Sequence, residues 1–334
     1  MPEPAETRPQ PPRVPEATPN AREVPPDAPL FIVLNPKSGS HGDEDVRRLI
    51  EEALSAAGRT FSLHEHDGTP EFDAKVAGIV KEARARGGIV VAAGGDGTIN
   101  SVAAATLGSG CTFGVLPLGT FNYFSRAHGI PSDVRAACQL LLARRAYEVQ
   151  VGMVNDRVFL VNASIGLYPE LLEEREAAKA RLGRSRLVAF GAALGTLLRP
   201  HRRLRIQIEA KSGPRKVVTQ SLFIGNNRLQ LRRVGIAESE LVEQHRLVAV
   251  MTRPVGLWGM LALVVRAALG RLGEAKDVQS FDFERLHVRP RLGRSKVKVA
   301  TDGEVELLPV PLAFRVAPHP LWLLRPADAG EDPG

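Results

Sequence analysis

The stretch Ile89-Val90-Val91-Ala92-Ala93-Gly94-Gly95-Asp96-Gly97-Thr98 places a short apolar run directly before a glycine-rich turn. The apolar run predicts a buried strand, and a helix is expected to begin near Ile99. Glycines allow the main chain to approach a ligand closely, and a helix start presents unpaired N–H groups, which suits a phosphate. A tight strand-to-helix turn capped by Asp96 is the plain structural alternative for one such loop.

Two more apolar runs, 30–34 and 113–116, also end in turns rich in glycine or proline. Between them, helical spacing of apolar residues predicts helices from Asp43 to Ala57, ended by Gly58, and from Glu71 to Arg86. Alternating strands and helices predict a parallel α/β sheet. Because ligands bind at the carboxyl edge of such a sheet, we expect the three turns to meet there.

Beyond residue 150 the pattern changes to alternating apolar and polar residues, which predicts a mainly antiparallel β-sandwich. The segments are 204–208, 247–251, 281–283 and 297–299. Helical insertions are expected near Pro169 to Leu198 and near Val255 to Leu269. The predicted domains are therefore an α/β unit over 30–150 and a β-rich unit over 151–326, whose tail is free to return to the first unit.

Composition restricts the class of protein. The 334 residues include only two cysteines, Cys111 and Cys138, which excludes a disulfide framework and favours the cytosol. Residues 1–29 contain ten prolines and no apolar signal-peptide core, so they are interpreted as a disordered leader. The longest apolar run, 255–265, is too short to span a bilayer, so membrane contact is expected to be peripheral.

The usual nucleotide-binding motifs are missing: no Gly-Lys pair of a P-loop occurs, and no Gly-x-Gly-x-x-Gly follows a strand. Three other motifs occur in order: Asn35-Pro36-Lys37-Ser38-Gly39, Gly94-Gly95-Asp96-Gly97-Thr98-Ile99-Asn100 and Pro117-Leu118-Gly119-Thr120-Phe121-Asn122. This series resembles the diacylglycerol kinase catalytic domain family, which includes sphingosine kinases and bacterial lipid kinases. The resemblance covers about 30–124 and is reinforced by Asp302-Gly303-Glu304.

The resemblance implies a nucleotide domain like that of NAD kinases and phosphofructokinase, followed by a β-sandwich, with ATP and Mg²⁺ in the cleft between them. It implies that Asp96 organises Mg²⁺, directly or through water, and that Glu304 is the general base beside the acceptor hydroxyl. The implied ATP-binding residues are Asn35, Ser38, Thr69, Gly94, Gly95, Asp96, Gly97, Thr98, Ile99, Asn100, Thr120 and Asn122.

Several positions depart from the family pattern. Ser101 and Tyr123 stand where carboxylates are frequent, and Glu170 is the acid nearest to another such segment, which makes it the second candidate for the base. A structural metal site of some bacterial members would fall at 244–247, without its aspartate. The alternative interpretation of Asp302-Gly303 is a hairpin turn between two strands, which is compatible with a catalytic Glu304.

Charge and apolar patterning point to an anionic partner. The formal net charge is +7, and the segment from Arg181 to Lys216 carries ten basic residues against one acid. Six more basic residues lie between Arg285 and Lys298. Such stretches are usually solvated, but on one face they would attract anionic lipid. Apolar residues from Leu257 to Leu263 fit either an acyl-chain pocket or an ordinary core helix. His64 and His66 could suggest a metal site, but the predicted strand that carries them offers no third ligand.

Three functions remain open from the sequence. An ATP-dependent lipid kinase acting on diacylglycerol or a related lipid agrees with all four motifs. An NAD kinase-like enzyme shares Gly94-Gly95-Asp96-Gly97 but not the first and third motifs. A non-catalytic protein that binds lipid or nucleotide would explain the missing carboxylates. Nucleic-acid binding is not supported, because no recognisable motif accompanies the basic charge.

Overall fold

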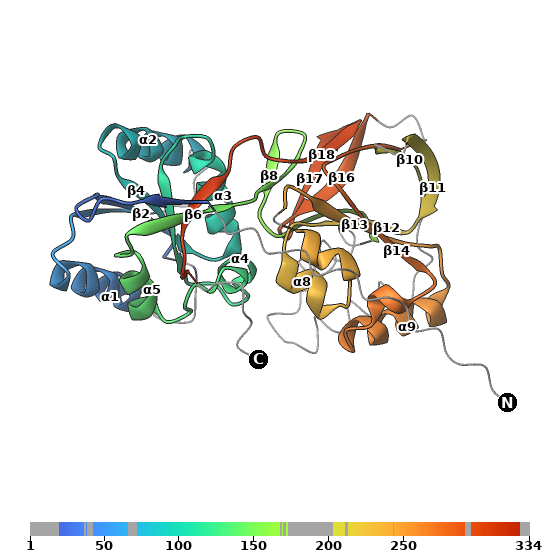
Figure 1. The fold of residues 1–334 in the computed structure, drawn as a ribbon, viewed down its shortest axis with the longest axis horizontal. Coiled ribbons are helices and arrows are strands. Elements are labelled where there is room, and N and C mark those ends of the chain that lie inside the picture. Colours follow the sequence, from blue (N-terminus) through green and yellow to red (C-terminus); the bar gives the residue numbers. More distant parts are fainter. Residues whose placement is uncertain are drawn as a thin grey trace.

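The computed structural model describes residues 20–36, 38, 43–65, 72–167, 169, 172, 203–210, 213–242, 244–290 and 295–327. Two lobes lie side by side along the longest axis (Figure 1). One contains a seven-stranded sheet and the other two six-stranded sheets. The predicted fold class, a parallel α/β lobe followed by an antiparallel β-sandwich, is confirmed.

The first lobe is built on a sheet with the strand order β1-β6-β19-β5-β4-β2-β3. Its strands are β1 (Ala21–Glu23), β2 (Leu30–Leu34), β3 (Phe61–Glu65), β4 (Ile89–Gly94), β5 (Thr112–Pro117), β6 (Arg145–Val149) and β19 (Leu321–Leu324). The five strands β19, β5, β4, β2 and β3 run parallel, while β6 and β1 are antiparallel to their neighbours. The helices of this lobe are α1 (Asp43–Ala56), α2 (Phe72–Ala85), α3 (Asp96–Thr106), α4 (Tyr123–Ala127) and α5 (Val134–Leu140).

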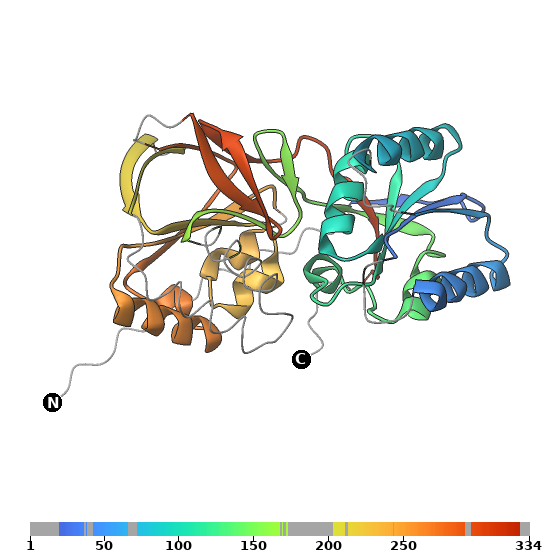
Figure 2. The same ribbon diagram turned by 180° about the vertical axis from the view of Figure 1, so that it is seen from behind.

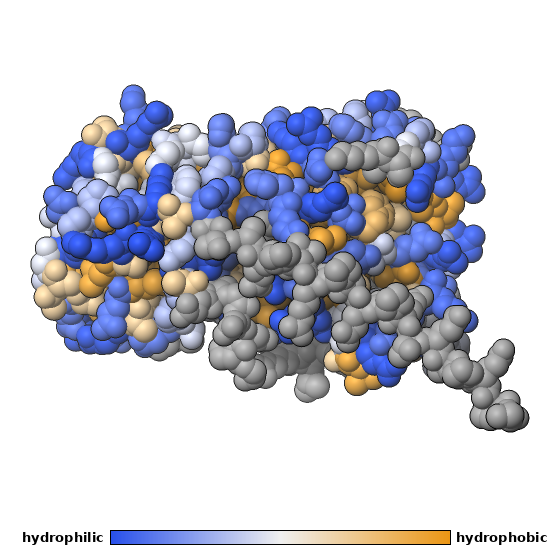
Figure 3. Space-filling model, viewed as in Figure 1, coloured by the Kyte–Doolittle hydropathy of each residue, from blue (hydrophilic) through white to orange (hydrophobic). Residues whose placement is uncertain are grey.

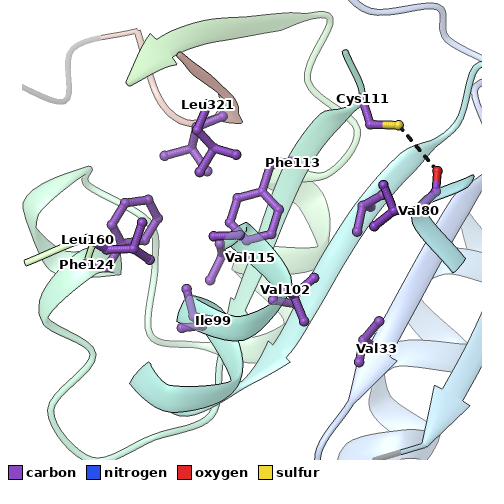
Figure 4. Packing of buried hydrophobic residues seen from close by; sticks show 14 of the residues in the cluster. Val33, Val80, Ile99, Val102, Cys111, Phe113, Val115, Phe124, Leu160 and Leu321 are labelled. Carbon is purple, nitrogen blue, oxygen red and sulfur yellow. Dashed lines mark hydrogen bonds between the residues drawn. The ribbon is translucent and has the colours of Figure 1, made fainter. Parts of the chain in front are cut away.

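Both faces of this sheet are covered, which explains its continuous apolar strands. Alternate residues of β2 and β4 enter two cores, one against α2 and α3 and the other against α1 and α5 (Figure 1). On the first face, Ile99 and Val102 of α3 pack toward Phe113 and Val115 of β5 (Figure 4). This packing fixes the direction of α3 and therefore the position of its first turn.

The chain returns to the first lobe near its described end. Strand β19 lies between β5 and β6, with Trp322 opposite Thr112 on one side and opposite Glu148 on the other. Its Leu321 and Leu323 are buried in the same core as α3. Within the described residues, the chain passes between the two lobes after β6 and again before β19.

The second lobe is a sandwich of two antiparallel sheets. One has the order β11-β10-β15-β18-β7-β8, and the other β14-β13-β12-β9-β16-β17. The first sheet contains β7 (Gly152–Val154), β8 (Arg157–Phe159), β10 (Leu204–Ala210), β11 (Gly213–Thr219), β15 (Arg285–Pro290) and β18 (Leu312–Val316). The second contains β9 (Asn162–Gly166), β12 (Ser221–Gly225), β13 (Leu247–Thr252), β14 (Val278–Phe283), β16 (Lys296–Thr301) and β17 (Glu304–Pro309). Inward residues of both sheets form one core.

Helices cover one outer side of this sandwich: α8 (Arg228–Arg233), the 3₁₀ turns η1 (Ala237–Leu241) and η2 (Leu272–Glu274), and α9 (Leu257–Ala268). Helix α9 confirms the predicted insertion near 255–269. The other predicted insertion, 169–198, lies almost entirely outside the described residues. Within the part of the chain that the structure describes, no helix combines the length and apolar character needed to cross a bilayer.

The predicted disordered leader is too long at its C-terminal end. Strand β1 pairs with β6, and Val24 and Ala28 are buried in the core beside β2. The ten prolines of residues 1–29 made this strand hard to predict. Residues 20–24 contain no proline, however, and a short edge strand needs only a few such residues. The side chain of Arg22 strengthens the contact by donating to the carbonyl of Gly110 and to Thr112 Oγ1, both at 2.9 Å.

Removing residues 1–29 should therefore lower the free energy of unfolding by roughly 2 kcal/mol or more, since burial of one Val side chain alone contributes about that amount. The measurement is urea denaturation of a chain that starts at residue 30. A chain that starts at residue 20 is the control and should unfold like the full chain. Equal midpoints for the two truncated chains would contradict the role of β1.

Candidate functional site

The three glycine-rich turns meet at the carboxyl edge of the parallel strands, as expected. A Cβ placed on Gly119 would lie 2.8 Å from Gly95 Cα, so the second and third turns touch backbone to backbone. A Cβ on Gly95 would lie 3.9 Å from Ser38 Oγ, which brings in the first turn. Any side chain at Gly119 would collide with this contact. The glycines therefore create a tight backbone cradle at the start of α3.

Hydrogen bonds hold the turns to one another. The Asn35 side-chain amide donates to Thr98 Oγ1 at 2.9 Å, which links the first turn to the first turn of α3. The N–H of Leu118 donates to the carbonyl of Gly94 at 2.9 Å, which links the second turn to the third. Helix α3 starts in this cradle, and the first N–H groups of a helix have no acceptor within the helix. They are available to an anion bound above the cradle.

Asp96 is the first residue of α3 and faces the start of α4. Burial raises the pKa of its carboxyl group, and the backbone amides of Tyr123, Asn122 and Phe124 oppose this by lowering it. Its Oδ1 is buried and has no hydrogen-bond partner among the described residues. A carboxylate oxygen in this state, beside a cradle suited to an anion, would fit a bound cation.

Glu304 comes to the same place from the second lobe. Asp302 and Gly303 both have positive φ, 48° and 96°, and form a two-residue hairpin turn between β16 and β17. The turn brings Glu304 Oε1 to 3.1 Å from where a Cβ on Gly97 would stand. The side chain of Glu304 is exposed, so it can meet a substrate. Both interpretations of Asp302-Gly303-Glu304 therefore hold: it is a hairpin turn, and it delivers a carboxylate to the cradle.

Comparison with known proteins agrees with this geometry. Residues 29–154 match the family model of the diacylglycerol kinase catalytic domain. This part of the chain is therefore similar to diacylglycerol kinase catalytic domains. The resemblance expected from the motifs is thus confirmed.

Relatives and solved structures extend the likeness beyond these residues. A "Probable lipid kinase YegS-like" of Cronobacter sakazakii is 35% identical over 160 residues, covering 46% of this chain and 51% of that protein. Its namesake in Enterobacter sp. (strain 638) is 33% identical over 179 residues, covering 52% and 58%. The chain spans about half the length of these curated relatives. A diacylglycerol kinase structure from Bacillus anthracis str. Sterne has a TM-score of 0.66 at 20% identity, covering 90% of this chain and 97% of that one, which shows a shared two-lobed fold.

The first lobe is tied to the second lobe through Asp302, a residue whose own role the motif did not reveal. Its Oδ1 accepts the N–H groups of Val161 and Asn162, both at 2.9 Å. Its Oδ2 accepts the N–H of Leu160 and the side-chain amide of Asn100 on α3, both at 2.6 Å. Burial raises the pKa of Asp302, while these donors lower it. Asp302 therefore connects α3, the link between β8 and β9, and the hairpin that carries Glu304.

Replacing Asp302 by Asn should lower both stability and turnover. The Asn side chain has only one acceptor oxygen, so its NH₂ group would face two of the four donors. Leaving those donors without an acceptor should lower the free energy of unfolding by roughly 1–3 kcal/mol. The measurements are urea denaturation and kcat, with Asp156→Asn as the control because Asp156 occupies an exposed hairpin turn between β7 and β8. Wild-type stability in Asp302→Asn would show that the four hydrogen bonds contribute little.

Not every predicted site residue faces the cradle. Ile99 is fully buried in the core and its N–H donates to the Gly95 carbonyl, so its side chain does not face the cradle, and its contact with ATP stays a prediction. Asn100 binds Asp302, as described above, instead of facing the cradle. Asn122 is buried and donates to the Gly119 carbonyl at 2.8 Å, so it shapes the third turn. Thr120 is exposed at the rim.

Some predicted residues lie elsewhere or outside the described residues. Thr69 and Glu170 belong to the latter group. At 244–247, Arg246 forms salt bridges with Asp282 and Glu284, so a basic side chain occupies the segment that lacks the metal-binding aspartate. Among the residues that the structure describes, no group of three or more His, Cys, Asp or Glu side chains is placed to hold a metal ion.

An aromatic pair at the rim was not anticipated from the sequence. Phe121 and Tyr123 are 49% and 40% exposed, and their rings stack with centroids 5.6 Å apart and an interplanar angle of 2°. They flank Asn122 next to Thr120. The sequence signal that could have identified this pair is the alternation of the aromatic residues Phe121 and Tyr123 with Asn122 in the third turn. Their position suits contact with the planar or apolar part of a ligand.

Proposed function

We propose that this protein is an ATP-dependent lipid kinase that transfers the γ-phosphoryl group to a hydroxyl of diacylglycerol or a related lipid. The observation that carries this proposal is the meeting of two carboxylates at one backbone cradle. Asp96 supplies the first carboxylate from inside the α/β lobe, and Glu304 supplies the second from the sandwich lobe. The family of the catalytic domain supports a kinase.

The cradle would hold the ATP phosphates. The close approach of the backbone leaves no room for a side chain at Gly119, and the first N–H groups of α3 favour negative charge. Ser38 and Thr120 add hydroxyl groups at its edges. Positioning and charge stabilisation of this kind provide most of the acceleration in phosphoryl transfer.

The residues present fit Mg²⁺ bound together with phosphate. Asp96 Oδ1 is buried without a partner, and Mg²⁺ commonly takes one or two carboxylates plus phosphate oxygens, with water completing the shell. Asp96 would hold the ion directly or through water. When bound, Mg²⁺ would neutralise charge on the β- and γ-phosphates.

Glu304 would act as the general base. Its carboxylate would take the proton of the acceptor hydroxyl while that oxygen bonds to the γ-phosphorus, and the bond from this phosphorus to the bridging oxygen of ADP breaks. The exposed position of Glu304 beside Gly97 leaves space for the acceptor. The proposal also places the enzyme in the cytoplasm, where ATP is available, with peripheral access to membrane lipid.

The test is transfer of radiolabel from γ-labelled ATP to a panel of diacylglycerol, monoacylglycerol, sphingosine and phosphatidylglycerol, separated by thin-layer chromatography. A labelled lipid that depends on Mg²⁺ is the expected result. NAD belongs in the same panel, because labelled NADP in place of labelled lipid would reassign the enzyme to NAD kinase chemistry. Nucleotide binding without transfer to any acceptor would indicate a binding protein.

A further inference from the structure

Helix α9 exposes large apolar side chains on its outer side. The exposed fractions are 82% for Trp258, 67% for Leu269, 57% for Val265 and 46% for Val264. Its inner side packs Met260 and Leu263, each 6% exposed, toward the sandwich. A helix that is apolar all round is normally buried on every side. Here the outer side is open, and hydrophobic surface is visible in this region of the space-filling view (Figure 3).

Arginines lie at the C-terminal ends of α8 and α9. The C-terminal end of α8 meets the C-terminal end of α9, where the N–H of Leu272 donates to the Val234 carbonyl at 2.9 Å. Arg232 and Arg233 end α8, and Arg266 lies in the last turn of α9. We call the set Trp258, Val264, Val265, Leu269, Arg232, Arg233 and Arg266 the α9 face. The acid of the adjoining turn η2, Glu274, is bound by Arg271 at 2.8 Å.

We propose that the α9 face docks the enzyme on an anionic lipid surface. This inference rests on the proposed function, because a kinase of membrane lipids must reach its acceptor at the bilayer. Large apolar residues beside arginines are the chemistry of helices that lie in the membrane interface. An apolar partner alone would leave the arginines without counter-charges, whereas anionic head groups supply them.

The α9 face is also connected to the cradle. The N-cap of α8, Asn227, donates from its side-chain amide to the Tyr123 carbonyl at 3.3 Å, at the start of α4. Helices α4, α8 and α9 follow one another along the same side of the molecule in both views (Figures 1 and 2). A bilayer that contacts α9 would therefore lie along the side on which the rim of the site opens toward α4.

The basic strands that were candidates for this role from the sequence are less suitable. In the described part of 181–216, Arg205 and Arg215 belong to β10 and β11. These strands belong to one sheet of the sandwich, whereas α9 packs on β13 of the other sheet, on the side where α4 and α8 also lie (Figure 1). We therefore assign docking to the α9 face instead.

The first experiment uses Trp258 as its own reporter. In a Trp322→Phe background Trp258 is the single tryptophan, since the chain has two. Its fluorescence should shift to the blue with phosphatidylglycerol vesicles, and brominated acyl chains should quench it. Vesicles of pure phosphatidylcholine should bind roughly 10-fold more weakly, and affinity for the anionic vesicles should fall steeply as salt rises to physiological strength.

Variants with matched controls distinguish binding through the α9 face from nonspecific adsorption to lipid. Trp258→Ser with Leu269→Ser, and separately Arg232→Gln with Arg233→Gln, should each lower vesicle affinity by at least roughly 10-fold. Val218→Ser and Arg215→Gln on β11 are the controls, because both residues are exposed and belong to a strand outside the α9 face. Thermal melts establish that every variant folds.

Unchanged vesicle binding in both α9-face pairs would overturn the proposal, as would a Trp258 spectrum that does not respond to lipid. A doubled mass in light scattering that Trp258→Ser abolishes would reassign the face to a second copy of this chain. Transfer assays with a short-chain acceptor dispersed in detergent keep the two proposals apart. Activity there without docking refutes only the α9 face, and docking without activity refutes only the kinase.

Discussion

Replacing Glu304 by Gln should lower turnover by roughly 10²-fold or more while leaving the affinity for ATP nearly unchanged. Gln keeps the size of the side chain and one acceptor oxygen, but its amide cannot accept the proton of the acceptor hydroxyl. The side chain is exposed beside Gly97, so the loss should not disturb packing. The measurements are kcat with a lipid acceptor and equilibrium binding of a non-hydrolysable ATP analogue, made on one preparation.

Glu306→Gln is the matched control for this variant. Glu306 lies on the same strand, but its carboxylate is held in a salt bridge with Arg157 at 2.8 Å. We expect it to retain wild-type turnover. If Glu304→Gln keeps its turnover while ATP affinity collapses, Glu304 is a ligand of the nucleotide or its metal, and Glu170 becomes the next candidate for the base.

Replacing Asp96 by Asn should lower the rate of phosphoryl transfer by roughly 10²-fold or more without lowering thermal stability. Burial raises the pKa of Asp96, so the ionised form is less favourable in the folded state than in the unfolded state. A carboxyl group with a raised pKa stabilises the fold only at low pH, and at neutral pH its ionisation costs stability. The uncharged Asn removes that cost, and its amide can take the place of Oδ1, which has no partner among the described residues.

The melting temperature of Asp96→Asn should therefore equal or exceed that of the wild type at pH 7, and the difference should shrink at acid pH. Asp133→Asn provides the comparison, because Asp133 is an exposed N-cap that accepts the N–H of Ala136 at 2.8 Å. That variant should stay active and melt at nearly the wild-type temperature, because Asn caps a helix about as well as Asp. A melting temperature that falls in Asp96→Asn would make Asp96 a cap for α4, and full activity would remove it from the nucleotide site.

The sequence alone was sufficient to predict the α/β lobe and the meeting of its three turns. Strands such as 30–34 and 89–93 are apolar throughout, which is possible only when both faces of a sheet are covered. Parallel strands then bring the turns that follow them to one edge, so local patterns were enough to place Gly95 beside Gly119. Strand β1 could not be predicted in this way, because three residues among prolines have too little pattern to show pairing with β6.

Only the tertiary structure decided which side chains face the cradle and what joins the two lobes. Ile99, Asn100 and Asn122 belong to the motifs, but packing turns the first into the core and hydrogen bonds turn the others toward Asp302 and Gly119. Glu304 is separated from Gly97 by 207 positions in the chain, and they meet because the β16–β17 hairpin packs on α3, where Asn100 donates to Asp302. Such contacts depend on how whole sheets pack against each other. No local pattern encodes them, because each residue's partner is chosen by distant parts of the chain.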